Sequence, residues 1–125
     1  MKTLTKEQVL LLHEKIIDRY GGVQGIRDES LLESALNAPF QSFSGTDLYL
    51  SVEEKAVRLG YGLIKNHPCR DGNKRIGTLA MLVMLELNDD VSINANNEEL
   101  TDEIMKAAAG ELSEEQLLEW VRSKR

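Results

Sequence analysis

The run of apolar residues from Ile76 to Leu87 is the feature that most constrains the fold of this chain. It is shorter than the ~18 residues that indicate a membrane-spanning helix. A helix that carries apolar side chains almost all round is typical of one that its neighbours bury in a protein core. We therefore expect a central helix from about Asp71 to Leu87, with the other elements packed around it.

Further helices are indicated on both sides of this run by apolar residues at helical spacing and by helix-start signals. Three serine or threonine residues stand three positions before a glutamine or glutamate, as in a capping box, and Asp28 can cap another helix. The expected helices run from Thr5 to Arg19, Asp28 to about Ala38, Ser51 to about Asn66, Asp71 to Leu87, Glu98 to Ala109, and onward from Ser113. We predict an all-α fold, a compact bundle of about six helices in one domain over residues 1–125.

Three other segments are predicted to lack regular structure. Gly21 and Gly22 indicate a turn and not a phosphate loop, because no strand precedes them and no Gly-Lys-Ser/Thr follows. The segment from Val91 to Asn94 is extended but too short to predict a sheet. The loop from Pro39 to Leu50 contains aromatic residues, which either anchor it to the body of the protein or make it a flap over a site.

The composition limits the classes of partner. A net charge of −6 and a pI near 5.0 argue against a non-specific nucleic-acid-binding protein, which needs a basic face. Cys69 is the only cysteine, and Met1-Lys2-Thr3 leads into a charged helix without an apolar signal segment. We expect a cytoplasmic protein that binds neither membranes nor nucleic acid directly.

The segment from His67 to Arg75, with the sequence HPCRDGNKR, concentrates reactive groups just before the central helix. An imidazole can take a proton from an attacking hydroxyl and release it again, so His67 can act as a general base. Asp71 can cap the helix, or it can bind Mg²⁺ together with nucleotide phosphates. These are the candidate catalytic residues.

The residues that follow Asp71 are suited to phosphate. Gly72 lets the backbone approach a ligand closely, and Asn73, Lys74 and Arg75 offer amide, ammonium and guanidinium donors. A helix N-terminus attracts anions through its unpaired N–H groups. We predict a phosphate site here, to which Lys65 could add a further positive charge.

This motif resembles the signature of the Fic/Doc superfamily, and specifically its death-on-curing (Doc) branch. The segments Leu11 to Glu14 and Arg19 to Gly22 are also similar to the N-terminus of Doc toxins, and the expected helix order resembles their small all-α fold. The resemblance covers nearly the whole chain.

The resemblance implies nucleotide-dependent modification of a protein hydroxyl. Fic proteins have glycine at the position of Lys74 and transfer AMP, whereas Doc proteins have lysine there and transfer the γ-phosphoryl group. The chain therefore looks like a protein Ser/Thr kinase of the Doc type that uses ATP and Mg²⁺. By resemblance His67 is the base, Asp71 serves the metal or the hydroxyl, and Asn73, Lys74 and Arg75 hold phosphates.

The same resemblance implies partners. Doc toxins modify elongation factor Tu, which stops translation, and a cognate antitoxin neutralises them by folding a helix into a groove on the toxin. Two alternatives stay open, namely an AMP transferase of the Fic type and a catalytically weak binding module of the same fold.

Three positions depart from the family pattern. Cys69 stands where the family usually has a phenylalanine that anchors the catalytic loop, so a void or a compensating contact is expected there. Cys69 could also be a reactive thiol beside His67. Ile76-Gly77 replaces the more usual Thr-Ala, and we interpret this change as one of packing.

Overall fold

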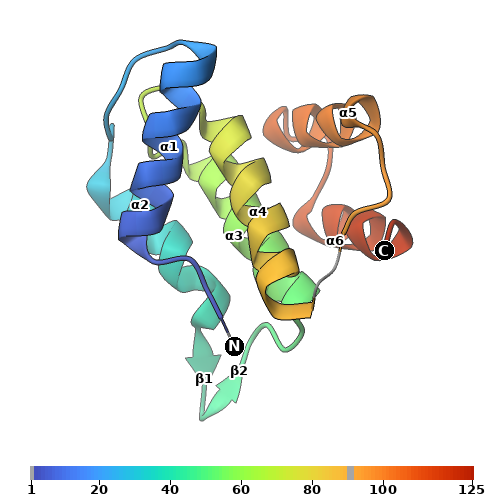
Figure 1. Cartoon of the computed structure of the whole chain (residues 1–125). Coiled ribbons are helices and arrows are strands. Elements are labelled where there is room, and N and C mark those ends of the chain that lie inside the picture. The colour runs from blue at the N-terminus through green and yellow to red at the C-terminus, as the bar shows by residue number, and fades with distance from the viewer. Residues whose placement is uncertain (1, 90–91) are drawn as a thin grey trace.

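Figure 1 shows the computed structural model of the chain, which describes residues 2–89 and 92–125. Six α-helices and one small hairpin make up this part of the chain. The helices are α1 (Lys6–Tyr20), α2 (Glu29–Asn37), α3 (Val52–Asn66), α4 (Asn73–Asp89), α5 (Asn97–Ala108) and α6 (Glu114–Ser123); a 3₁₀ turn η1 (Ala38–Phe40) precedes strands β1 (Ser42–Phe43) and β2 (Thr46–Asp47). The predicted all-α class with about six helices is confirmed.

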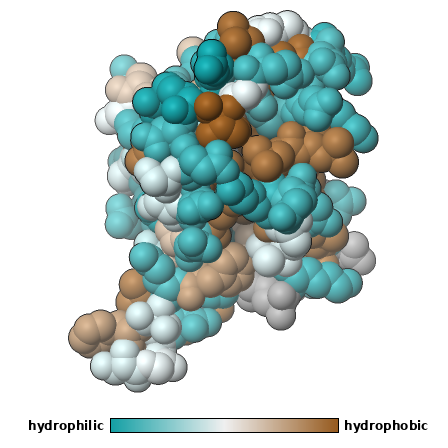
Figure 2. Space-filling model, turned by 90° about the vertical axis from the view of Figure 1, so that its left-hand side faces the viewer, coloured by the Kyte–Doolittle hydropathy of each residue, from teal (hydrophilic) through white to brown (hydrophobic). Residues whose placement is uncertain are grey.

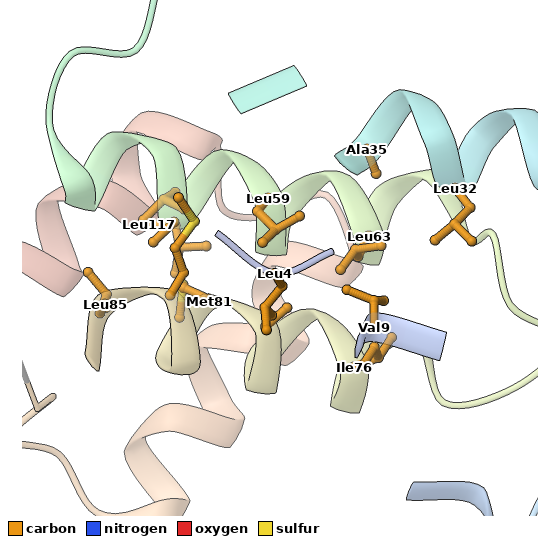
Figure 3. Close-up of a cluster of buried hydrophobic side chains, with 14 of the residues drawn as sticks. Leu4, Val9, Leu32, Ala35, Leu59, Leu63, Ile76, Met81, Leu85 and Leu117 are labelled. Atoms are coloured by element: carbon orange, nitrogen blue, oxygen red, sulfur yellow. The ribbon is translucent and has the colours of Figure 1, made fainter. Parts of the chain in front are cut away.

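The central pair is α3 and α4, which run antiparallel, with α1 and α2 on one side and α5 and α6 on the other (Figure 1). Apolar side chains of α3 and α4 face one another, and residues of α2, α6 and the N-terminal segment complete the core (Figure 3). The fully buried members include Leu32, Leu59, Leu63, Ile76, Met81, Met84, Leu85 and Leu117. The apolar run noted in the sequence thus lies at the centre of the fold.

A pair of glycines lets α3 and α4 approach closely. A Cβ on Gly77 would lie 2.6 Å from Ile64 Cγ1 and 2.8 Å from the carbonyl oxygen of Gly60. A Cβ on Gly60 would meet the Gly77 carbonyl oxygen at 2.8 Å. Real side chains do not tolerate such contacts, so the glycine at position 77 serves packing, as the sequence indicated.

The predicted helix starts are confirmed, but Ser51 and Glu54 do not form the expected reciprocal capping box, because the Glu54 carboxylate accepts from the Ser51 hydroxyl and not from the Ser51 N–H. Thr5 with Gln8 and Ser113 with Gln116 form reciprocal capping boxes, while Asp28 and Ser51 cap α2 and α3. The central helix begins at Asn73 and not at Asp71, because Gly72 has a φ of 78°, outside the right-handed helical region. Helix α5 begins and ends one residue earlier than predicted.

The predicted loop from Pro39 to Leu50 contains a two-stranded antiparallel hairpin, which the sequence did not predict. The buried ammonium of Lys55 holds it by donating to the carbonyl oxygens of Pro39 and Tyr49 and to Asp47. The hairpin projects from the body of the molecule (Figure 2), and Phe43 is 76% exposed, so this ring is not an anchor.

The hairpin is not a flap over the predicted phosphate site either. It lies at the N-terminal end of α3, whereas His67 follows the C-terminal end (Figure 1). Fifteen helical residues separate the two ends by about 22 Å. Of the segment predicted to be extended, Val91 lies outside the described residues, and Ser92 to Asn94 form no strand. None of the helices in residues 2–89 and 92–125 has the length and apolar character needed to cross a membrane.

Candidate active site

The segment from His67 to Gly72 joins the C-terminus of α3 to the N-terminus of α4, at the end of the bundle opposite the hairpin (Figure 1). A pocket of about 210 Å³ opens at this junction. It is lined by His67, Arg70, Asp71, Gly72, Asn73, Lys74 and Arg75. The fold therefore brings all the predicted site residues except Lys65 to one pocket.

His67 has a left-handed backbone conformation, with φ 55° and ψ 49°. Pro68 disfavours the right-handed helical region at the residue before it, and His67 lies outside that region. A residue with a Cβ in this conformation carries a strain of order 1–3 kcal/mol, which surrounding contacts must offset. The conformation ends α3 and leaves the exposed side chain of His67 at the edge of the pocket.

The segment from Gly25 to Asp28 supplies those contacts. Arg27 donates from Nε to the carbonyl oxygen of His67 at 2.8 Å and from Nη2 to that of Asn66 at 3.1 Å. The main-chain N–H groups of Arg27 and Asp28 both donate to the Pro68 carbonyl oxygen, at 2.7 and 3.1 Å. The site loop is thus held to a segment far away in the sequence.

Cys69 is buried within this loop and is 1% exposed. It forms a β-bridge with Ile26, and the Arg70 N–H beside it donates to the Gly25 carbonyl oxygen at 3.1 Å. Burial raises the pKa of the Cys69 thiol to about 11. The thiolate is scarce at neutral pH, so the structure argues against a reactive thiol at this position.

Asn73 is turned inward, and its side-chain amide is engaged twice with Cys69. The Cys69 N–H donates to Asn73 Oδ1 at 2.9 Å, and Asn73 Nδ2 donates to the Cys69 carbonyl oxygen at 3.0 Å. The residue is 4% exposed. In this arrangement the Asn73 side chain shapes the loop, and its predicted donor atoms point away from a ligand in the pocket.

Asp71 is fixed by two contacts with the N-terminal part of the chain. Its Oδ2 accepts a hydrogen bond from the Val23 N–H at 2.7 Å, so the carboxylate is bonded to the Gly21–Gly25 segment and not to the first turn of α4. Its carbonyl oxygen accepts from His13 Nε2 at 2.6 Å, which fixes the tautomer of the buried His13.

Asp71 offers one exposed carboxylate as a ligand for the predicted Mg²⁺. The described residues contain no cluster of three or more histidine, cysteine, aspartate or glutamate side chains that could hold a metal by themselves. Mg²⁺ commonly binds through one or two carboxylates together with substrate phosphates. The donor set is therefore suitable for a nucleotide-bound ion and not for a protein-only metal site.

Gly72 begins the part of the pocket that was predicted to bind phosphate. The first helical hydrogen bond of α4 runs from the Ile76 N–H to the Gly72 carbonyl oxygen, so the N–H groups of Asn73, Lys74 and Arg75 precede the helical ladder. A Cβ on Gly72 would lie 3.1 Å from Ile17 Cδ1 and would also require the unfavourable positive φ. The close packing against α1 therefore depends on glycine here.

The side chains of Lys74 and Arg75 are exposed beside these N–H groups. The Arg75 guanidinium lies over the ring of Tyr20, 4.4 Å from its centroid, which orients it along α1. Two cations at a helix N-terminus oppose the helix dipole, so this end of α4 is favourable for an anion such as phosphate.

Lys65 does not join the group. Its Nζ lies beside Gly110, 3.7 Å from the position that a Cβ on this glycine would take, and Lys65 does not line the pocket. Lys65 still belongs to α3, whereas His67 follows its end in a left-handed conformation, so the two side chains have different neighbours.

A larger groove of about 600 Å³ adjoins the pocket and shares Lys74 and Arg75 with it. It lies between α1, α4 and α5, and its apolar lining includes Ile16, Tyr20, Leu79, Leu82, Leu100, Ile104 and Met105. Leu79 and Leu82 are only partly buried. The central helix, expected to be covered on all sides, therefore presents one apolar face to this groove.

Two residues that hold the site were not recognised as such in the sequence. The sequence does indicate that His13 is buried, because it stands at helical spacing between Val9 and Ile16. In the structure it is 3% exposed. A buried histidine requires a polar partner, although the sequence does not identify it as the Asp71 carbonyl. The sequence does not indicate a role for Arg27, because nothing in the chain around it distinguishes it from a solvated arginine.

The helical fold and the basic pocket at a helix N-terminus define a candidate phosphate-binding protein. The family model described as "Fic/DOC family" matches residues 3–85, which include the whole segment from His67 to Arg75. This chain belongs to the Fic/DOC family.

Two curated relatives carry names of this family. "Toxin Doc" of Mycolicibacterium smegmatis is 36% identical over 69 residues, which cover 55% of this chain and 53% of that protein. "Protein kinase doc" of Escherichia phage P1 is 28% identical over 113 residues, which cover 90% of this chain and 87% of that protein. The chain thus matches about half the length of the mycobacterial toxin and most of the phage kinase.

Proposed function

We propose that this chain is the toxin of a toxin–antitoxin pair and transfers the γ-phosphoryl group of ATP to a serine or threonine hydroxyl of a protein. The observation that carries this proposal is the pocket in which His67 lies beside a cationic helix N-terminus formed by Lys74 and Arg75. The names of the two relatives, a toxin and a protein kinase, support the same function.

The proposed chemistry assigns a step to each group. The target hydroxyl oxygen attacks the γ-phosphorus, the bond from that phosphorus to the β–γ bridging oxygen breaks, and ADP leaves. His67 accepts the hydroxyl proton, an effect that contributes roughly 10²–10⁴-fold to the rate. The side chains of Lys74 and Arg75 and the first N–H groups of α4 bind the phosphate oxygens, since phosphoryl transfer depends on positioning and charge stabilisation.

Mg²⁺ would be held by Asp71 together with the nucleotide phosphates, and it would neutralise charge on the leaving group. The hydrogen bond from the Val23 N–H fixes Oδ2 of this carboxylate, and Asp71 lines the pocket. The proposed cofactors are therefore ATP as co-substrate and Mg²⁺.

A well-held site loop favours an active enzyme over a catalytically weak binding module. The small side chain of Cys69 offers little anchoring by itself, but hydrogen bonds from Arg27, Asp28 and Asn73 hold the main chain of the loop. These polar contacts compensate for the smaller side chain, so Cys69 is compatible with catalysis.

Transfer of the label from ATP tests the reaction. The protein is incubated with Mg²⁺, elongation factor Tu as the proposed target in the cytoplasm, and ATP labelled at either the α or the γ phosphate. Label from the γ phosphate is expected on the target, and label from the α phosphate is not. Label arriving only from the α phosphate indicates an AMP transferase, and transfer to other proteins of a lysate but not to elongation factor Tu overturns the proposed target.

His67→Ala is the variant that tests the role of the base. We expect it to abolish label transfer and growth arrest on expression, while the unfolding temperature stays near that of the wild type because the side chain is exposed. Lys65→Ala is the matched control, since it removes a charge two residues away that lies outside the pocket. Growth arrest that persists in His67→Ala would instead support a binding module.

The groove between α1, α4 and α5 is the proposed site for the helix of a cognate antitoxin. An amphipathic helix in an apolar groove is a common mode of protein recognition. This groove adjoins the phosphate pocket, and Met105 and Tyr20 in it are about half exposed. We expect Met105→Glu to weaken antitoxin binding without loss of label transfer, whereas Leu11→Glu, on an exposed position outside the groove, leaves binding unchanged.

A further inference from the structure

The left-handed conformation of His67 needs an explanation within this chain. A non-glycine residue avoids this region unless surrounding contacts determine it. At His67 the chain leaves α3, and the carbonyl groups of Asn66 and His67 lie at the helix C-terminus, where helical partners are no longer available. Whatever satisfies these carbonyls also fixes the direction in which the imidazole leaves the chain.

Arg27 makes these contacts and does so from 40 residues away. Its guanidinium reaches the carbonyl oxygens of Asn66 and His67, and its main-chain N–H reaches that of Pro68. Arg27 therefore binds three successive carbonyls, and the middle one belongs to His67, the proposed base.

The environment of the guanidinium supports a dedicated role. Arg27 forms no ion pair with a carboxylate within residues 2–89 and 92–125. Its positive charge lies at the C-terminus of α3, where the helix dipole favours a cation. Hydrogen bonds from a charged donor are also stronger than neutral ones.

We propose that Arg27 is a positioning residue, which holds the backbone of His67 in its left-handed conformation and so aims the imidazole into the phosphate pocket. This inference rests on the proposed function for its catalytic consequence. Arg27 does not line the pocket, so it acts through His67 and not on the nucleotide.

Arg27→Ala tests the catalytic consequence by label transfer from γ-labelled ATP. We expect kcat to fall about 10- to 100-fold, because a displacement of about 1 Å in a reacting group has effects of this size. The KM for ATP should stay within about twofold, since the substitution removes no contact with bound ATP. Arg27→Lys keeps the charge but lacks the fixed fork of the guanidinium, so it should be intermediate. Added guanidinium ion should partly restore the activity of Arg27→Ala.

Arg122→Ala is the matched control. It also removes one arginine charge and the hydrogen bonds to Ser51 and Glu54, but these lie at the other end of α3. We expect it to lower the unfolding temperature by a similar amount and to leave kcat unchanged. Equal loss of kcat in the two variants, an unchanged kcat in Arg27→Ala, or a raised KM alone would overturn the positioning role.

A second readout does not depend on activity. The one-bond coupling between Cα and Hα of His67 and the nuclear Overhauser effect between its own N–H and Hα, measured by NMR, report the left-handed backbone of the wild type, because both depend on the sign of φ. In Arg27→Ala both should move toward values averaged over extended and helical conformations, and unchanged values would contradict the proposal. If the wild type transfers no label, the proposed function fails while this NMR comparison still decides the effect of Arg27. If Arg27→Ala does not fold, Arg27→Lys serves for both measurements.

Discussion

The main chain of Cys69 and the side chain of Asn73 bond to each other in both directions, at 2.9 and 3.0 Å. Both residues are almost fully buried. The pair closes the loop that carries the candidate base onto the first turn of α4, so the geometry of the pocket depends on an amide that does not itself face it.

Replacing Asn73 should therefore affect stability and activity together. Asn73→Ala leaves a buried N–H and a buried carbonyl of Cys69 unpaired, and we expect a loss of about 2 kcal/mol or more in the free energy of unfolding. Urea denaturation measures this loss, and hydrogen exchange at the Cys69 N–H should accelerate. Asn96→Ala, which removes the cap of α5, should lower stability by about 1 kcal/mol without affecting label transfer.

The Cys69 thiol should resist alkylation. Because burial raises its pKa to about 11, only roughly one molecule in a thousand carries the thiolate at pH 8. Iodoacetamide followed by mass spectrometry should leave the folded protein unmodified and should label it in denaturant. Rapid labelling of the folded protein with loss of label transfer would restore the interpretation of Cys69 as a reactive residue.

His13 should matter for the site although it lies outside the pocket. His13→Leu removes the donor to the Asp71 carbonyl, and the displaced start of α4 should transfer label roughly tenfold more slowly. His13→Gln keeps a side-chain N–H donor of similar reach, so it should retain most of the rate. Equal losses in the two variants would show that packing of the ring, and not the hydrogen bond, is what the site requires.

The close approach of α3 and α4 can be tested with one methyl group. Gly77→Ala brings a Cβ to 2.6 Å from Ile64 Cγ1 and should lower the free energy of unfolding by about 1–3 kcal/mol. Gly62→Ala is the matched control, since its Cβ would lie in ordinary contact at 3.4 Å from Ala35 Cβ. Thermal unfolding should show the control to be neutral or slightly stabilised, because alanine favours the helix.

The cap of α2 should contribute a pH-dependent part of the stability. The Ser30 hydroxyl, and then the Leu31 N–H, hold the pKa of the Asp28 carboxyl below its ordinary value. Since the folded state binds this proton less readily, the contribution is present above about pH 4 and is lost as the pH falls through the folded pKa. Asp28→Asn keeps a capping oxygen without the charge.

Unfolding of the wild type and Asp28→Asn should therefore be compared from pH 7 to pH 2. The difference in unfolding free energy between them should be constant near neutrality and should shrink in acid. A difference that does not change with pH would mean that the charge of Asp28 does not contribute.

Much of the fold could be predicted because its signals are local. Capping residues such as Thr5 and Ser113 bond within their own first turn, so four residues of sequence contain both partners. The hairpin escaped prediction for the opposite reason. Its strands contain two residues each, and it is held by Lys55, a buried charge that the sequence places on the same helix as many solvated ones.

The candidate site divides in the same way. The residue types from His67 to Arg75 suggested a base beside a phosphate, and the helix that follows them could be read from its apolar run. The structure turned Asn73 inward and directed Lys65 toward Gly110, because side-chain direction depends on neighbours from other helices. Residues that the sequence assigned to one phosphate site therefore have different roles in the structure.

The sequence by itself determined that a cationic motif with one histidine begins a central apolar helix. Only the tertiary structure decided what holds that motif in place. Arg27 and His13 reach the motif from 40 and 58 residues away, and both bind main-chain carbonyls. Every residue has such a carbonyl, so no pattern of side chains in the sequence could indicate which carbonyls these two residues would bind.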